Sequence, residues 1–291
     1  MFRVAKILFP VDFSPRSKRA AHYAGMLACR FRSELTLLHV MPPFDGYPIY
    51  AMEAAVGSLD PMGPLGDELT QQLDQFANDQ FPRLQTTRLV LEGDPAARIV
   101  ETAASGHADL IVMPTHGYGR FRRFILGSVT AKVLHDADCP VFTGTHLEEE
   151  NGADAGLFQN ILCAIDLGPQ SQSVLKWGAA MAAELHAKLH VVHALPALEA
   201  GQARYFDQDW RIDLERSECV DLEKLVAEAG LKKANVLLNN GEVSRVVCNA
   251  AKATGADLVV IGRHAGAGIF GRLRQHAYAI VRESPCPVVS V

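Results

Sequence analysis

The sequence predicts an α/β protein built from two tandem, doubly wound, Rossmann-like domains, each with a five-stranded parallel sheet of order 3-2-1-4-5. Short, nearly all-apolar runs of the kind that form strands buried on both faces alternate with segments of helical periodicity. Such alternation is typical of a parallel sheet covered by helices on both sides. The whole pattern then occurs twice along the 291 residues, as in a duplicated domain.

The first copy contains five strand-like runs separated by helical or loop-like segments. The expected strands are "KILFPV" (6–11), "LTLLHV" (35–40), "RLVLE" (88–92), "DLIVM" (109–113) and "PVFTG" (140–144). A helix is expected between the first two strands, where apolar residues recur at helical spacing from Ala20 to Phe31. A second helix begins with Pro95 in its first turn and runs to about Ala104.

Two further parts of the first copy stand out. The stretch from Met41 to Gly66 is rich in proline and glycine, so we expect a long loop with at most short structure. Such a loop could be a mobile cover or an idle insertion. The pair Gly127-Ser128 is expected at the head of a helix that follows a loop of small and basic residues.

Four segments of the first half recur in the second. The echoes are "NILCAID" (160–166) for "KILFPVD" (6–12), "LHVVHA" (189–194) for "LTLLHV", "GADLVVIGRHAG" (255–266) for "HADLIVMPTHGY" (107–118), and "CPVVSV" (286–291) for "CPVFTG" (139–144). Asp166 thereby corresponds to Asp12. We expect one domain at residues 1–146, an acidic linker at 147–156 and a second domain at 157–291.

The composition excludes several classes of protein. A net charge of −5 argues against a general nucleic-acid binder. No apolar run approaches the roughly 18 residues needed to cross a bilayer, and the amino terminus reaches Asp12 too early for an export signal. The six scattered cysteines have no metal-finger or C-x-x-C spacing. They are expected to be reduced thiols of a cytoplasmic protein without a membrane partner.

Ligands of an open parallel sheet bind at the carboxyl ends of the strands, where the strand order reverses. With order 3-2-1-4-5 this point lies between the first and fourth strands. Asp12 follows the first strand and residues 114–117 follow the fourth, so we expect them to meet in one crevice. Taken alone, Asp12 could equally cap the helix ahead, as could Ser14, and a glycine after a strand could only form a turn.

These residues resemble the nucleotide-binding motif of the universal stress protein family. That motif is G-x2-G-x9-G-[ST] after the fourth strand, with an Asp at the end of the first strand. The sequence matches it at Gly117 and, after nine intervening residues, at Gly127-Ser128, and it departs from it at Pro114, which stands where the first glycine is expected. The resemblance covers both copies, apart from the linker and the loop after the second strand.

The resemblance implies ATP as the ligand of the amino-terminal domain, alone or with Mg²⁺ or Mn²⁺. It implies that Asp12 and the backbone near Val11 and Val40 hold adenine and ribose. The remaining implied binding residues lie after the fourth strand and around the next helix start: Met113, Pro114, Thr115, His116, Gly117, Arg120, Gly127, Ser128, Val129 and Thr130. His116 recurs as His264, so a structural role in the turn is an equal alternative.

The physical reasons for this motif can be stated independently. Gly117 would let backbone N–H groups approach an anion closely, and Gly127 and Ser128 stand at a helix start, where unpaired N–H groups favour phosphate. The Ser128 hydroxyl could bind phosphate or only cap its helix. Arg120, Arg122 and Arg123 make the intervening arc positive, although a solvated loop face is as good a reading for any one of them. Pro114 lacks a backbone donor, which is expected to weaken binding without abolishing it.

The second copy lacks the phosphate loop. Asp166 remains, but the stretch after Gly262 has no glycine followed by Ser or Thr at the family spacing. We expect this domain to bind no ATP and to act as a pairing partner or to hold another ligand. The last strand of each copy is apolar, and similar proteins dimerise through it. An intrachain pseudo-dimer of the two domains is therefore expected, with a homodimer of chains as a further option.

Four functions remain open at this stage. The sequence favours an ATP-binding module of stress response or signalling. It contains no G-x4-G-K-[ST] motif, no kinase signature and no evident general base, so an enzyme would be at most a slow ATPase. A nucleotide-free interaction scaffold describes the second copy better than the first. A redox role through Cys139 or Cys286 is the weakest alternative.

Overall fold

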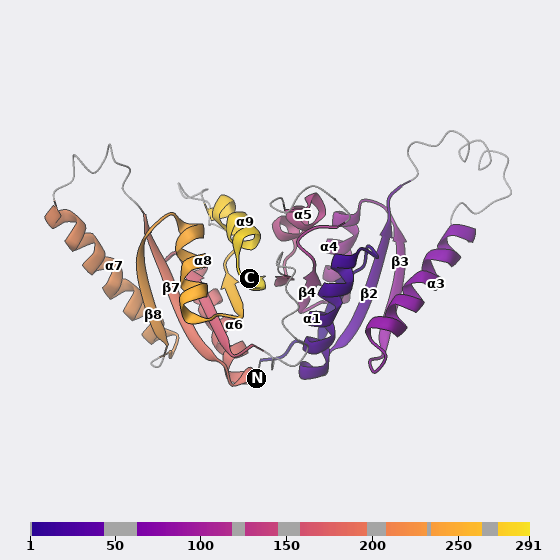
Figure 1. Ribbon diagram of the computed structural model, residues 1–291, viewed down its shortest axis with the longest axis horizontal. Helices are drawn as coiled ribbons and strands as arrows, with labels where there is room; N and C mark the ends of the chain where they lie inside the picture. Colours follow the sequence, from indigo (N-terminus) through magenta and orange to yellow (C-terminus); the bar gives the residue numbers. More distant parts are fainter. Residues whose placement is uncertain are drawn as a thin grey trace. The chain divides into compact units, whose positions relative to one another are not determined.

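The computed structural model describes residues 2–43, 63–117, 126–144, 158–196, 208–231, 234–263 and 273–291 (Figure 1). It contains two compact units, Arg3–Gly144 and Thr145–Val291, which we call the amino-terminal and carboxyl-terminal domains. The expected linker at 147–156 lies outside the described residues. Within the described ranges, no helix combines the length and the apolar character that crossing a bilayer requires.

The amino-terminal domain alternates strands and helices as expected. Its elements are β1 (Lys6–Pro10), α1 (Pro15–Phe31), β2 (Glu34–Met41), α3 (Gly63–Gln80), β3 (Thr86–Glu92), α4 (Pro95–Gly106), β4 (Leu110–Met113), α5 (Ser128–Asp136) and β5 (Val141–Thr143). The strands pair in parallel in the order β3-β2-β1-β4-β5. The predicted doubly wound sheet is therefore confirmed for this domain.

The carboxyl-terminal domain repeats this arrangement. Its elements are β6 (Asn160–Ile165), α6 (Ser171–Leu185), β7 (Lys188–Pro196), α7 (Gln208–Glu228), β8 (Asn235–Gly241), α8 (Val243–Thr254), β9 (Leu258–Ile261), α9 (Leu273–Glu283) and β10 (Val288–Ser290). The parallel order β8-β7-β6-β9-β10 is the same topology with the numbers of the second copy. The tandem repeat seen in the sequence is thus also a repeat of structure.

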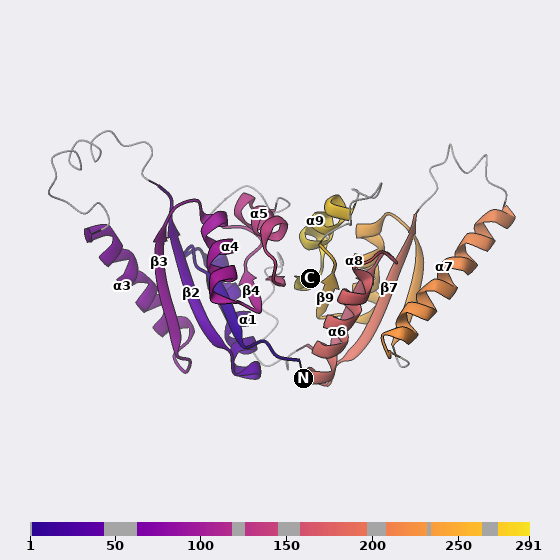
Figure 2. The same cartoon turned by 180° about the vertical axis from the view of Figure 1, so that it is seen from behind.

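Helices cover both faces of each sheet. In the amino-terminal domain α1 and α3 pack together on one face, and α4 and α5 pack together on the other (Figures 1 and 2). In the carboxyl-terminal domain α8 and α9 pack together, with α6 on the opposite face. The central strands are fully buried, as Phe9, Leu37 and Ile111 are in one domain and Ile161 and Val259 in the other. Burial on both faces explains why these strands read as continuous apolar runs.

One helix was not found from the sequence. The stretch from Met41 to Gly66 was expected to be a loop, but Met41 ends β2 and α3 begins at Gly63; residues 44–62 lie outside the described part. The α3 side chain Phe76 packs on Phe9 of β1, with ring centroids 6.3 Å apart, and Phe81 lies beside the same ring at 6.0 Å. This aromatic cluster holds α3 on the sheet although the helix start has no clear local signal.

In both domains an aspartate carboxylate accepts hydrogen bonds from two backbone amides at the start of the first strand, an arrangement that we call the carboxylate clamp. Asp109 accepts hydrogen bonds from the amides of Ala5 and Lys6, at 2.7 and 2.9 Å. Asp257 accepts from Gln159 and Asn160, at 2.6 and 3.0 Å. Each Asp stands just before the fourth strand of its domain and fixes the start of the first strand beside it. Burial raises the pKa of Asp257, and its two amide partners only partly offset that rise.

Helix starts are capped by side chains where the sequence supplies them. Ser14 caps α1 by accepting from the Ser17 amide, and Asp94 caps α4 by accepting from the Ala97 amide. Pro15 and Pro95 occupy the first helical turn, where no amide donor is needed. In the carboxyl-terminal domain Glu242 caps α8, accepting from the amides of Ser244 and Arg245.

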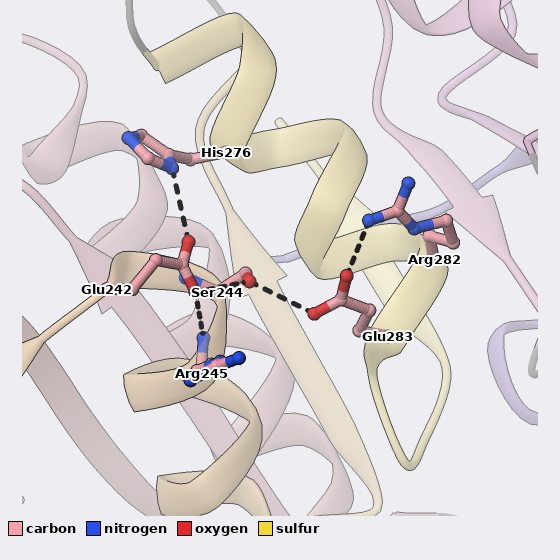
Figure 3. A network of polar contacts seen from close by, with 6 residues as sticks. All are labelled: Glu242, Ser244, Arg245, His276, Arg282 and Glu283. Atoms are coloured by element: carbon pink, nitrogen blue, oxygen red, sulfur yellow. Dashed lines mark hydrogen bonds and ion pairs between the residues drawn. The ribbon is translucent and has the colours of Figure 1, made fainter. Parts of the chain in front are cut away.

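The Glu242 cap is part of a larger polar network (Figure 3). The Ser244 hydroxyl, which is buried, lies 2.8 Å from Glu242 Oε2 and 3.1 Å from Glu283 Oε2 of α9. A hydroxyl carries one proton, so Ser244 donates to one carboxylate at a time. His276 of α9 lies 3.6 Å from Glu242 Oε1. The network therefore ties the start of α8 to both ends of α9.

We expect Glu242→Gln to remove a pH-dependent part of the stability of the carboxyl-terminal domain. Burial raises the pKa of Glu242, but hydrogen bonds from Ser244 and Arg245 and the nearby His276 hold it below its ordinary 4.5. A lowered folded-state pKa means that the carboxylate stabilises the fold above about pH 4.5 and that this contribution disappears as pH falls through the folded-state value. At pH 7 the variant should lose about 1 kcal/mol, as for other N-caps.

Urea unfolding followed by tryptophan fluorescence measures this effect selectively, because Trp177 and Trp210 both belong to the carboxyl-terminal domain. Glu228→Gln, at the exposed end of α7, is the matched control for the loss of one negative charge. The gap between the two variants should close as the pH is lowered below 4.5. A gap that stays constant from pH 7 to pH 4 would contradict the role assigned to the cap.

Candidate functional site

The candidate site lies at the carboxyl ends of β1 and β4, where the strand order reverses. Asp12 comes two residues after β1, and residues 114–117 follow β4 directly. A Cβ placed on Gly117 would lie only 2.3 Å from Asp12 Oδ2. The two segments therefore meet in space although about a hundred residues separate them, as the predicted strand order required.

Asp12 serves the turn and also faces the site. Its Oδ1 accepts from the Ser14 amide at 2.9 Å, and its own amide donates to the Ser17 hydroxyl at 3.3 Å. Phe13, which follows, has a left-handed backbone with φ of 60°, a conformation that costs a non-glycine residue about 1 kcal/mol. These contacts hold the carboxylate so that its second oxygen lies against Gly117. The N-cap of α1 is Ser14 and not Asp12, so Asp12 shapes the turn before the helix through one oxygen and faces Gly117 with the other.

The start of α5 is docked closely on the segment after β4. The Gly127 amide donates to the Thr115 carbonyl at 2.9 Å, and a Cβ on Gly127 would lie 3.1 Å from His116 Cα. Gly127 has an ordinary backbone, with φ of −62°, so glycine is favoured there by the close approach and not by the torsion angle. The expectation of an unpaired amide at this glycine is corrected, because that amide is already bonded.

The free amides at this helix start belong to the next three residues. The first backbone hydrogen bond of the helix runs from the Ala131 amide to the Gly127 carbonyl, at 2.8 Å. The amides of Ser128, Val129 and Thr130 precede it and have no intrahelical acceptor. Ser128 is the first helical residue and is exposed, with Gly127 as the N-cap, so the alternative in which Ser128 caps the helix is not realised.

The side chains around the loop mostly support it from inside. Thr130 is buried and its hydroxyl donates to the Pro114 carbonyl at 3.1 Å. Thr115 and His116 are also buried, and Thr115 Oγ1 lies 3.2 Å from His116 Nδ1. Met113 ends β4 in the core. The structure thus assigns these four side chains a structural role in shaping the loop.

The strand ends on the other side of Asp12 involve a histidine that the sequence reasoning missed. His39 Nδ1 lies 2.7 Å from the Val11 carbonyl, and the Val11 amide donates to Leu38 at 2.8 Å. The Phe13 ring packs on the His39 ring, with centroids 4.6 Å apart. Val11 and Val40 are themselves buried. His39 recurs as His193 within the matching strand sequences, a signal that could have revealed it.

A cation also reaches the site from α1. Arg16, in the first turn of that helix, donates through Nη1 to the Gly117 carbonyl at 2.6 Å. The sequence pattern gave no reason to separate Arg16 from the solvated basic residues around it. The arginines that were expected to line the phosphate loop, Arg120 with Arg122 and Arg123, lie outside the described residues.

The corresponding edge of the carboxyl-terminal domain has the same turn but different side chains. Asp166 Oδ1 accepts from the Gly168 amide at 3.0 Å and from the Ser171 hydroxyl at 3.1 Å. Leu167 repeats the left-handed backbone of Phe13, with φ of 59°. Arg263 stands where the first domain has Thr115, and it is buried. The helix that follows, α9, begins at Leu273 and not at a Gly-Ser pair.

His193 of β7 occupies the place of His39 and gains a partner there. Its Nδ1 lies 2.9 Å from the Ile165 carbonyl and its Nε2 lies 2.6 Å from Glu218 Oε2 of α7. Because a carbonyl only accepts, Nδ1 is the donor in the first contact. This side of the edge is thus closed by the contact between His193 and Glu218, whereas the amino-terminal domain has the aromatic contact between Phe13 and His39.

The described residues offer little for metal or redox chemistry. No group of three or more His, Cys, Asp or Glu side chains in these ranges is gathered as a metal site. All six cysteines are free thiols. Burial raises the pKa of Cys286 and of Cys163 to about 12 and that of Cys248 to about 11. Thiols held in this form are poor nucleophiles, which argues against the redox alternative for Cys286.

Comparisons with known proteins give a consistent result. A sequence model of the universal stress protein family matches residues 3–143 and 157–291. A universal stress protein of Methanocaldococcus jannaschii is 37% identical over 138 residues, which cover 47% of this chain and 79% of the relative. One from Thermus aquaticus is 33% identical over 138 residues, covering 46% of this chain and 94% of the relative.

The fold is also found among solved structures. The crystal structure of a universal stress protein from Archaeoglobus fulgidus superposes with a TM-score of 0.64 at 19% identity, covering 99% of this chain and 96% of the other. At that identity the match establishes the fold and no more. Both halves of the chain therefore have the architecture of these proteins.

We expect Gly127→Ala to loosen the docking of α5. The added methyl group would press on the His116 backbone at 3.1 Å, and alanine is a poorer N-cap than glycine. Overpacking of this kind costs about 1–3 kcal/mol. Hydrogen exchange with mass spectrometry should show faster exchange in peptides covering 126–136. Gly106→Ala is the control, because a Cβ there meets nothing within 4 Å; equal exchange in both variants would show that the close approach is not constraining.

Proposed function

The chain belongs to the universal stress protein family, and we propose that its amino-terminal domain binds ATP as a nucleotide-dependent module of stress response or signalling. The observation that carries this proposal is the meeting of Asp12, Gly117 and the start of α5 at the switch point. A carboxylate suited to hydroxyl groups and a helix start suited to phosphate lie there side by side. Their order along this edge of the sheet fits a nucleoside joined to a phosphate chain.

The local structure supports a polyanionic ligand. Any side chain on Gly117 would strike the Asp12 carboxylate, so glycine at that position lets the carboxylate lie directly against the loop after β4. Three successive amides at Ser128, Val129 and Thr130 precede the first hydrogen bond of α5, and the positive end of the helix dipole lies at the same place. The implied divalent ion, Mg²⁺ or Mn²⁺, would be held mainly by the phosphates themselves.

The carboxyl-terminal domain is proposed to act without ATP. It keeps Asp166, but Arg263 fills the position of Thr115, the glycine-serine pair is missing and the His193–Glu218 pair closes the nucleoside side. These features favour an interaction scaffold or a site for a different ligand. The two-repeat architecture also fits an intrachain pseudo-dimer. We also propose that two chains can form a homodimer. We further propose a cytoplasmic location, which is in keeping with the six free thiols.

An efficient ATPase is the less favoured alternative. Phosphoryl transfer needs a group that orients or deprotonates the nucleophile, together with positioned cations. The sequence has no G-x4-G-K-[ST] motif and no kinase signature that would supply such a set of groups. A turnover assay with added ATP would reveal any slow hydrolysis of the nucleotide.

The direct test is to denature the freshly purified full chain and to identify the released nucleotide by chromatography and mass. Recovered ATP is the expected result. Recovered ADP together with turnover of added ATP would favour the enzyme. A nucleotide-free chain that also fails to bind added ATP would overturn the proposal and leave the scaffold.

Asp12→Asn and Asp166→Asn form a matched pair that assigns the site to one domain. Asparagine keeps an acceptor for the turn amide in each case but removes the charge. Hydrogen bonds to charged groups contribute about 1.5–3 kcal/mol, so Asp12→Asn should weaken ATP binding about 10- to 100-fold. Asp166→Asn should leave the affinity unchanged. Isothermal titration decides between them, and the reverse pattern would move the site to the carboxyl-terminal domain.

A further inference from the structure

Arg16 holds a position that the family motif does not account for. Its Nη1 donates to the Gly117 carbonyl at 2.6 Å, and its side chain is half-buried. A guanidinium has five N–H donors, and this bond uses one of them. Among the ion pairs between described residues, none includes Arg16. A partly desolvated cation with spare donors favours an anionic partner.

The proposed phosphate site of this chain is short of backbone donors at two positions of the motif. Pro114 has no N–H group, and the Gly127 amide is already bonded to Thr115. Two of the motif positions therefore offer no amide to a ligand. A guanidinium beside Gly117 supplies charge and several donors in the same small region, so it can compensate for both losses.

The second domain provides an internal comparison. Its turn "DLGPQS" (166–171) matches "DFSPRS" (12–17), with Gln170 at the position of Arg16. Gln170 also lies against the loop after the fourth strand of its domain. A Cβ placed on Gly262 of that loop would be 3.0 Å from Gln170 Oε1. The position thus reaches the same loop in both domains. It carries a cation only in the domain that keeps Gly117 and Gly127-Ser128.

We propose that Arg16 is a phosphate-binding residue of the amino-terminal site and that it makes affinity rise with the number of phosphates on the adenine nucleoside. The inference rests on the proposed function, since it names a further residue of that same site. Arginine is suited to this role because its planar fork matches phosphate oxygens. On binding, the guanidinium would exchange its contact with the Gly117 carbonyl for phosphate oxygens or share itself between them.

The test compares Arg16→Gln with Arg19→Gln in the full chain. Arg19 lies on the same helix, is exposed, and controls for the loss of one positive charge. Adenosine, AMP, ADP and ATP are titrated into each protein by calorimetry. Arg16→Gln should weaken ATP about 10- to 100-fold and should leave adenosine unchanged, while Arg19→Gln should match the parent protein for all four ligands.

Arg16→Lys separates the planar fork from charge alone. It should recover part of the ATP affinity but not all of it, because lysine keeps the charge without the bidentate geometry. Circular dichroism and hydrogen exchange of the 110–117 segment check that each variant is folded. A variant that loses adenosine as well as ATP would overturn the proposal, since Arg16 would then support the fold or the nucleoside contacts.

Failure of this inference can be told apart from failure of the proposed function. If the parent protein binds ATP and Arg16→Gln binds it equally well, Arg16 has no phosphate role although the site stands. If the parent protein binds none of the four ligands, the proposed function is wrong, and the role of Arg16 falls with it.

Discussion

The candidate site depends on how closely three pieces of backbone approach one another at the switch point of the first sheet. Gly117 lies against the Asp12 carboxylate, and the start of α5 lies against His116 through Gly127. The Gly127–Thr115 and Thr130–Pro114 hydrogen bonds fix this arrangement from inside. Without side chains at these two glycines, the start of α5 and Asp12 can both lie against the segment after β4.

The two domains show how one scaffold can support different edges. Both domains keep the carboxylate clamp at the start of the first strand and the Asp after that strand. Both also keep the residue with a left-handed backbone that follows this Asp. These features concern the path of the chain. The differences lie where a ligand would be met: Arg16 against Gln170, Thr115 against Arg263, and the His39–Phe13 contact against the His193–Glu218 pair. The two copies have thus kept the geometry of the turn after the first strand, while the side chains around that turn have diverged.

Several details could not be predicted because their causes are not local. The sequence around 63–80 has no strong start signal, and α3 is held by Phe76 and Phe81 packing on Phe9 of a distant strand. The pairing of the Gly127 amide with Thr115 depends on how α5 docks, which no spacing rule specifies. Arg16 looked like an ordinary surface cation, and only the fold brings it within hydrogen-bond distance of Gly117. His39 could have been noticed, since its strand position recurs as His193.

The sequence by itself determined the fold class, the duplication, the strand order and the meeting of Asp12 with residues 114–117. It could do so because apolar periodicity, helix caps and the handedness of strand connections are properties of short segments and of their order. Only the tertiary structure decided which amides at the start of α5 have no intrahelical acceptor, which side chains are buried supports and which cation reaches Gly117. Those outcomes depend on contacts of a few ångströms between segments far apart in the chain, and such contacts exist only once the sheet and its helices have packed.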